Sequence, residues 1–141
     1  MTANNLMTLA IQEADMHHTP YGCVIYNRVT SEYIKAANQT RSKGKTAHAE
    51  IECLRLLNEK EWSPADLVLY TTAEPCPMCM SAIIWCKINE VVYGAPISDI
   101  KKYHRQIDIT SQTIVENSWS NCKIEVGFMK EDCLDLLEKH S

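Results

Sequence analysis

The spacing of apolar positions predicts an amphipathic helix near each end of the chain. In the N-terminal part, four residues recur at the i, i+3, i+4, i+7 spacing of one helical face: Met7, Ala10, Ile11 and Ala14. A similar pattern near the C-terminus contains Met129, Cys133, Leu136 and Leu137. Pro20 and Gly22 should end the first helix before the next segment begins. Both helices are therefore expected to pack one apolar face on a common core.

Short apolar runs between these helices predict β-strands. Residues 23–26 (C-V-I-Y) and 33–37 (Y-I-K-A-A) are separated by a polar turn, which favours a hairpin. Three later runs, bounded by polar or turn-forming residues, predict three more strands at 67–71, 90–94 and 123–126. The sequence thus predicts about five strands.

Two further helices are predicted between the later strands. One begins near His48, where Thr46 is a candidate N-cap, and the other covers residues 76–86, with Pro75 at its start. Strands that alternate with helices favour an α/β/α sandwich around a mixed sheet whose later strands are parallel. A length of 141 residues fits a single domain over residues 1–141. Residues 95–121 show no clear pattern.

Composition and charge narrow the class of protein. The chain is 45% hydrophobic and 23% charged, which is typical of globular domains. Its 14 basic and 18 acidic residues give a net charge of −4, so nucleic-acid binding would need a local basic patch. No apolar run approaches the roughly 18 residues that a membrane span requires. The N-terminal segment lacks a signal-peptide pattern, so we expect a cytoplasmic protein without membrane contact.

The cysteines introduce candidate chemistry. Seven cysteines without a secretion signal predict reduced thiols. Cys76 and Cys79 form a C-x-x-C pair at a predicted helix start, where backbone amides favour thiolates. From the spacing alone this pair can be a metal site, a redox pair or two small buried side chains.

The start of the preceding helix favours the metal site. In T-A-H-A-E-I-E (46–52), His48 supplies an imidazole, and Glu50 places a carboxylate on the buried face of the helix. Successive helix N-termini of an α/β unit open at the carboxyl ends of the strands, so His48 should meet Cys76 and Cys79. One His and two Cys leave a fourth position open for water, as in catalytic zinc sites. Glu50 could then carry the proton of that water.

Together, H-A-E (48–50) and P-C-P-M-C (75–79) resemble the H-x-E…P-C-x-x-C signature of the zinc-dependent cytidine deaminase superfamily. Residues 20–25 (P-Y-G-C-V-I) and 91–95 (V-V-Y-G-A) are also similar to the segments that enter the first strand and follow the cysteine helix in that family. The resemblance covers roughly residues 5–96.

This resemblance implies a cytidine deaminase-like fold with one Zn²⁺ per chain. His48, Cys76 and Cys79 would be the metal ligands, and Glu50 would carry the proton during hydrolytic release of ammonia from an amino-substituted base. The relatives are commonly dimers, so the resemblance also implies a homodimer.

Residues 74–85 (E-P-C-P-M-C-M-S-A-I-I-W) look most similar to the bacterial guanine deaminase and nucleoside deaminase branch. The superfamily resemblance implies the substrate-binding positions Tyr21, Asn38 and Ala49. The likeness to this branch adds Trp85, and R-Q-I-D-I (105–109), which is similar to a C-terminal segment of the branch, adds Asp108. Asn38 and Asp108 would orient the base, and Tyr21 and Trp85 would close over its faces. The backbone amide of Ala49 would lie near the substrate. Without the resemblance, Asn38 also fits a turn residue and Trp85 a core residue.

Guanine or a related purine base or nucleoside is the favoured substrate. The alternatives are a tRNA adenosine, which would need a basic surface that the net charge does not indicate, and a cytosine-type base. Gly44 and Lys45 stand where the family commonly has Asp-Pro, which leaves the substrate open. Two other classes of protein also remain possible from the sequence: a zinc-stabilised binding module, and a thiol–disulfide protein that uses Cys76 and Cys79.

Overall fold

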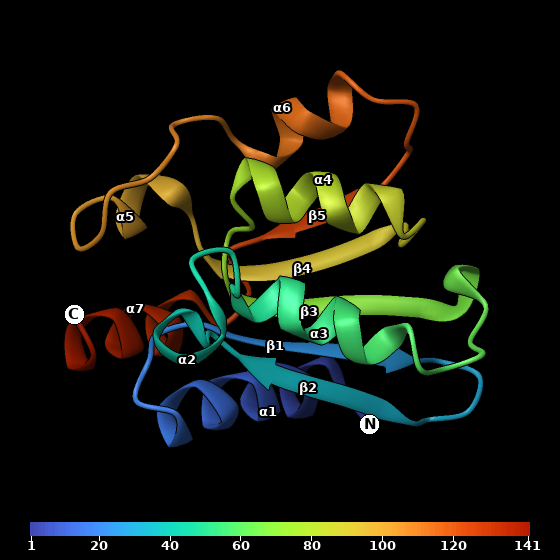
Figure 1. The fold of residues 1–141 in the computed structure, drawn as a ribbon, viewed down its shortest axis with the longest axis horizontal. Coiled ribbons are helices and arrows are strands. Elements are labelled where there is room, and N and C mark those ends of the chain that lie inside the picture. The colour runs from blue at the N-terminus through green and yellow to red at the C-terminus, as the bar shows by residue number, and fades with distance from the viewer.

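A mixed five-stranded sheet forms the middle layer of the protein (Figure 1). The computed structural model describes all residues, 1–141. The strands lie in the order β2-β1-β3-β4-β5, with these bounds: β1 (Gly22–Asn27), β2 (Tyr33–Ala37), β3 (Leu67–Ala73), β4 (Glu90–Ala95) and β5 (Lys123–Val126). β1 is antiparallel to β2 and β3, whereas β3, β4 and β5 are mutually parallel. The predicted mixed sheet and its parallel later strands are confirmed.

Helices cover both faces of this sheet (Figure 1). One face packs against α1 (Ala3–Met16) and α7 (Lys130–Lys139), and the other against α3 (Ala49–Leu57) and α4 (Pro77–Trp85). The remaining helices are short: α2 (Thr40–Lys43), η1 (Pro64–Asp66), α5 (Ile97–Ile100) and α6 (Ser111–Glu116). None of the helices is long and apolar enough to span a membrane.

The central strand β3 shows why the core has two halves. Every residue of β3 is buried, because helices cover both of its faces. Leu67 and Leu69 point into the cluster under α3 and α4, whereas Val68 and Tyr70 point into the cluster under α1 and α7. The strand therefore ends, at Ala73, with its position fixed by packing from both sides.

α3 and α4 start within one residue of the predicted positions, but the residues expected at their starts are displaced by two positions. His48, not Thr46, is the N-cap of α3, and Pro77, not Pro75, lies in the first turn of α4 after its N-cap Cys76. Both N-cap residues have an extended backbone and make no side-chain capping hydrogen bond. Because neither side chain caps its own helix, the His48 imidazole and the Cys76 thiol are free to bind a ligand.

Candidate metal centre

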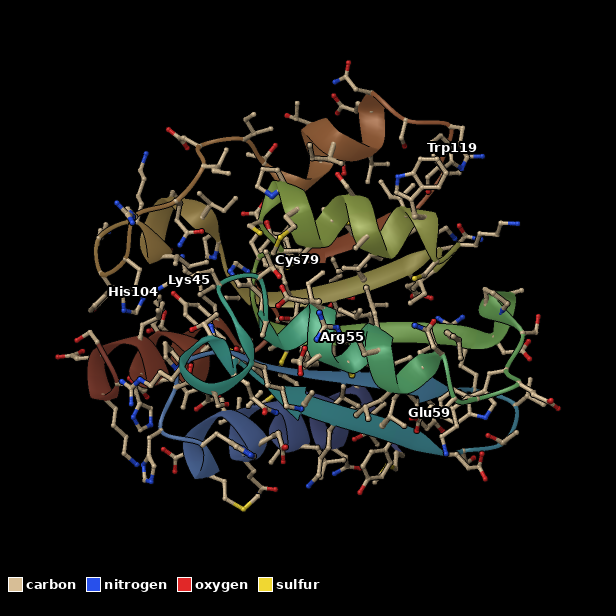
Figure 2. The ribbon with its side chains drawn as sticks, in the orientation of Figure 1. Lys45, Arg55, Glu59, Cys79, His104 and Trp119 are labelled. Atoms are coloured by element: carbon tan, nitrogen blue, oxygen red, sulfur yellow. The ribbon has the colours of Figure 1, made fainter.

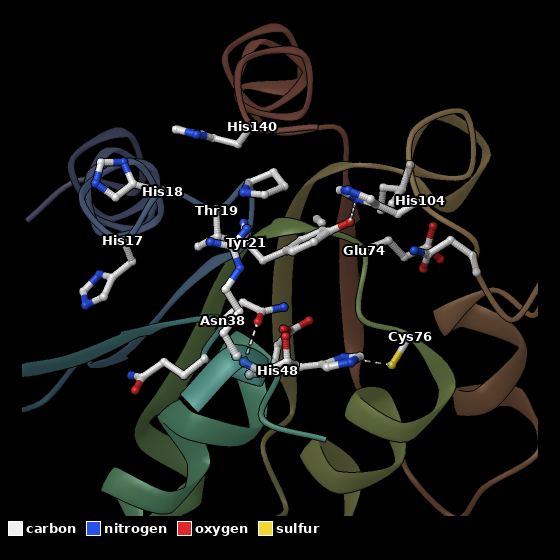
Figure 3. A pocket seen from close by; sticks show the side chains of 18 of the residues that line it. His17, His18, Thr19, Tyr21, Asn38, His48, Glu74, Cys76, His104 and His140 are labelled. Carbon is white, nitrogen blue, oxygen red and sulfur yellow. Dashed lines mark hydrogen bonds between the residues drawn. The ribbon is translucent and has the colours of Figure 1, made fainter. Parts of the chain in front are cut away.

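Three potential metal ligands converge where α3 and α4 begin. Figure 3 shows two of them, His48 and Cys76. The ligand atoms of His48, Cys76 and Cys79 all lie within 4.8 Å of one another. The Nδ1 atom of His48 is 3.6 Å from the Cys76 sulfur and 3.5 Å from the Cys79 sulfur. Ligands at about 2.1 Å (N) and 2.3 Å (S) from one tetrahedral zinc ion are separated by about 3.5 Å. The spacing therefore fits zinc, and the predicted triad is confirmed.

The electrostatics of the site favour the metal-binding form of Cys76. A hydrogen bond from the Cys79 thiol, reinforced by His48, lowers the pKa of the Cys76 thiol to about 4. A thiolate is the form of cysteine that binds metals. No fourth His, Cys, Asp or Glu joins this group, so one coordination position stays open, as in catalytic rather than structural zinc sites.

Glu50 stands beside the triad in the first turn of α3. It is only 6% exposed, and this burial, together with the negative charge of Cys76, raises its pKa to about 7. A carboxyl group in that range can both accept and donate a proton near neutral pH. Glu50 also lines the cavity onto which His48 and Cys76 open.

The cavity above the triad has a volume of about 510 Å³, which is in the range of sites for small organic ligands. Its lining comes from the segment after α1, from α2 and its flanking residues, from the starts of α3 and α4, and from the loop after α5. All five histidines of the chain line it: His17, His18, His48, His104 and His140. Figure 3 shows four of these imidazoles on the walls and His48 at the base.

Two of the five predicted substrate-binding residues line this cavity, Tyr21 and Asn38. The Tyr21 hydroxyl and His104 Nδ1 share a hydrogen bond of 2.6 Å, which fixes the phenol against the wall (Figure 3). The side-chain oxygen of Asn38 accepts a 2.9 Å hydrogen bond from the Thr40 backbone N–H. Ala49 follows the ligand His48 in the chain, but it is fully buried and does not line the cavity.

Trp85 and Asp108 lie outside the cavity of the single chain. Trp85 is the last residue of α4, about 12 Å of helix away from Pro77, and it is 71% exposed beside Trp119. The Asp108 side chain is 72% exposed and pairs with Lys101 at 3.4 Å. Within one chain neither residue lines this cavity, so their contact with the substrate stays a prediction.

Glu74 was not predicted from the sequence. It connects the site to residues 95–121, the segment whose sequence showed no clear pattern. Its carboxylate is 5% exposed and accepts hydrogen bonds from the Ile97 N–H (2.8 Å), the Ser111 N–H (2.8 Å) and the Ser111 hydroxyl (2.9 Å). One carboxylate thus ties the starts of α5 and α6 to the end of β3. The sequence did carry one indication of this role: in T-A-E-P-C (72–76), the acidic Glu74 directly follows an apolar strand.

Comparison with known sequences identifies relatives of this chain. The family model described as the cytidine and deoxycytidylate deaminase zinc-binding region matches residues 1–95. The chain is 37% identical over 82 residues to guanine deaminase of Bacillus subtilis, covering 57% of this chain and 53% of that protein. It is 28% identical over 134 residues to tRNA-specific adenosine deaminase of Streptococcus pyogenes, covering 92% and 73%. The chain spans about half or less of the length of the first curated relatives it matches.

Solved structures share the fold over nearly the whole chain. Guanine deaminase from Nitrosomonas europaea superimposes with a TM-score of 0.79 at 20% identity, covering 97% of this chain and 81% of that one. A structure from work on A-to-I editing by tRNA:A34 deaminases gives a TM-score of 0.73 at 25% identity, covering 94% and 99%. The five-stranded mixed sheet with its flanking helices is therefore a cytidine deaminase-like fold.

Proposed function

Because the chain belongs to the cytidine and deoxycytidylate deaminase zinc-binding family, we propose that it is a hydrolase that removes an amino group from a nucleobase or nucleoside and releases ammonia. One observation carries this proposal. The buried carboxyl group of Glu50 lines the same cavity as a His and Cys ligand group with an open position. A purely structural metal site or a thiol–disulfide pair would have no use for that carboxyl group.

The chain's own residues would divide the reaction between proton transfer and orientation. A zinc ion held by His48, Cys76 and Cys79 would supply Lewis-acid activation of water. Glu50 would accept one proton from the attacking water and donate it to a ring nitrogen of the base. It would then carry the second proton, from the added hydroxyl group, to the amine, which leaves as ammonia when the C–N bond breaks.

Tyr21 and Asn38 would orient the substrate. The hydrogen bond to His104 holds the Tyr21 ring in one place, so the ring can pack on a planar base without losing further conformational freedom. The Asn38 amide nitrogen makes no hydrogen bond within the chain, so it can donate to a polar edge of the base.

Guanine or a related purine is the base that we propose first, whatever groups it carries. The identity with the Bacillus subtilis guanine deaminase and the likeness of residues 74–85 support it. The second candidate is a tRNA adenosine, supported by the tRNA-specific adenosine deaminase that matches 92% of this chain. A cytosine-type base is the third, supported by a relative described as a probable cytosine deaminase of Schizosaccharomyces pombe.

We also propose that the protein is a homodimer. Trp85 and Trp119 are 71% and 65% exposed, and they pack edge to face with ring centroids 4.7 Å apart. Two adjacent exposed tryptophans form an apolar patch that a second copy could bury. Light scattering of the purified protein should give the mass of two chains, and a monomer at micromolar concentration would refute the proposal.

Ammonia release by the zinc-loaded protein tests the proposed activity. The substrates would be guanine, guanosine, adenosine, cytosine, cytidine, dCMP and a tRNA anticodon stem-loop, with Cys76→Ser as the inactive control. We expect one substrate to be turned over by the wild type and by no more than a trace in the variant. If no substrate released ammonia while zinc was still bound, the result would contradict the proposed function.

A further inference from the structure

The four arginines of the chain divide into two pairs by what they contact. Arg28 pairs with Glu90, and Arg55 pairs with Glu52 at 3.1 Å. The other two, Arg41 in α2 and Arg105 in the loop after α5, make no ion pair. Their guanidinium groups also donate no hydrogen bond within the chain. Both of these free arginines line the cavity above the metal centre.

No free carboxylate balances these two charges within the cavity. The only acids among its lining residues are Glu50 and Glu74, and both are buried. Both oxygens of Glu74 already accept hydrogen bonds from Ile97 and Ser111. Glu50 lies at the base with the metal ligands. In a chain with a net charge of −4, the mouth of this cavity is therefore a local cationic region.

The two arginines come from segments that lie at the same end of the sheet. Figure 1 shows α2 and α5 near one another at the end where α7 finishes. In Figure 2, His104, the neighbour of Arg105, lies on the same side of the molecule as Lys45, which follows α2. Exposed imidazoles of His17 and His18 line the same mouth. The His17 Nδ1–H already donates to the Glu13 carbonyl oxygen at 2.9 Å, whereas the His18 ring can donate to a ligand.

We propose that Arg41 and Arg105 bind a phosphate group of the substrate, so that the cavity takes a phosphorylated nucleoside rather than a free base. The guanidinium group binds phosphate oxygens through two parallel N–H bonds, which makes arginine the preferred residue for this group. The inference rests on the proposed function, because it places the base at Glu50 and the phosphate at the mouth. A bare base would leave much of the 510 Å³ cavity unfilled.

The phosphate can belong to a mononucleotide or to the backbone of an RNA, and the experiment separates these sources. The kcat/KM for ammonia release would be measured for base, nucleoside and 5′-monophosphate in the guanine, adenine and cytosine series, and for an anticodon stem-loop RNA. We expect a phosphorylated form to exceed its nucleoside by about tenfold or more. A higher kcat/KM for the monophosphate or for the RNA identifies which of them supplies the phosphate group.

The variants Arg41→Ala and Arg105→Ala test the two residues directly. Each should lower the ratio of kcat/KM for the phosphorylated form to that for the nucleoside by about tenfold. Lys123→Ala is the matched control, since Lys123 is exposed on β5, makes no ion pair and does not line the cavity. The control should leave the ratio unchanged. An unchanged ratio in both arginine variants, or a preference for the free base, would overturn the proposal.

Calorimetric binding to the zinc-loaded protein distinguishes this proposal from the proposed function. Absence of ammonia release from every substrate would refute the deaminase activity alone. Under that outcome, GMP, AMP and CMP should still bind about tenfold more tightly than guanosine, adenosine and cytidine, and the two arginine variants should abolish the difference. Equal binding of each nucleotide and its nucleoside would refute the phosphate site.

Discussion

His48 and Cys76 can serve as ligands because of their place at the helix starts. Each is an N-cap residue whose side chain forms no cap, and each precedes a helix packed on the same sheet face. The sequence predicted the triad correctly because a His, a C-x-x-C pair and two helix starts are all local patterns. The predicted cap at Thr46 was wrong by two residues, since helix boundaries depend on local geometry that spacing does not specify.

Replacing one ligand should abolish metal binding. Cys76→Ser removes a soft thiolate, and the remaining His48 and Cys79 cannot hold the ion with two protein ligands. We expect zinc, measured by plasma mass spectrometry, to fall from about one per chain to near zero. Cys86→Ser is the control, because Cys86 is outside the ligand group and should keep full zinc content. Retained zinc in Cys76→Ser would contradict the assignment of this ligand.

At the scale of elements, the predicted strands and long helices were confirmed, whereas the short helices could not be predicted. β3 and β4 were visible as buried apolar runs, because parallel strands between two helical layers are apolar on both faces. α5 and α6 have four and six residues, too few to show a helical period. They are held by tertiary hydrogen bonds to Glu74, for which a local sequence pattern carries no signal.

The variant Glu74→Gln should loosen the segment that contains α5 and α6. The amide would place N–H donors where one carboxylate oxygen now accepts from Ile97 or from Ser111. A buried donor left without a partner costs about 1–3 kcal/mol of unfolding free energy. Urea denaturation measures this loss, and Glu59→Gln, at an exposed position after α3 (Figure 2), should change stability by less than about 0.5 kcal/mol. Equal urea midpoints for Glu74→Gln and Glu59→Gln would contradict the proposal that Glu74 anchors α5 and α6.

The packing of β4 against α7 should be sensitive to one added methyl group. A Cβ on Gly94 would overlap the Cys133 side chain and would lie 2.9 Å from the Thr72 carbonyl oxygen. Because these neighbours belong to α7 and β3, relief requires the elements to move apart. We expect Gly94→Ala to lower the unfolding free energy by about 1–3 kcal/mol. A melting temperature equal to that of the wild type would show that the contact is not tight.

At the scale of the whole molecule, the predicted residues that form the ligand group or line the cavity all lie in the matched N-terminal region. The family model covers residues 1–95, which include the three ligands, Glu50, Tyr21 and Asn38. Trp85 and Asp108 were assigned by resemblance alone, and both lie outside the single-chain cavity. The charge of the cavity mouth was also beyond sequence reasoning. The net charge of −4 does not reveal that Arg41 and Arg105 line one cavity.

The central claim is that Glu50 carries the proton while His48, Cys76 and Cys79 hold the metal. The most direct test measures zinc content and ammonia release on the same preparation of Glu50→Gln, with the best substrate of the wild type. Glutamine keeps the size of the side chain but cannot accept and return a proton. We expect one zinc per chain and a turnover reduced by about 10²–10⁴-fold. Wild-type turnover in Glu50→Gln with zinc bound would contradict this claim.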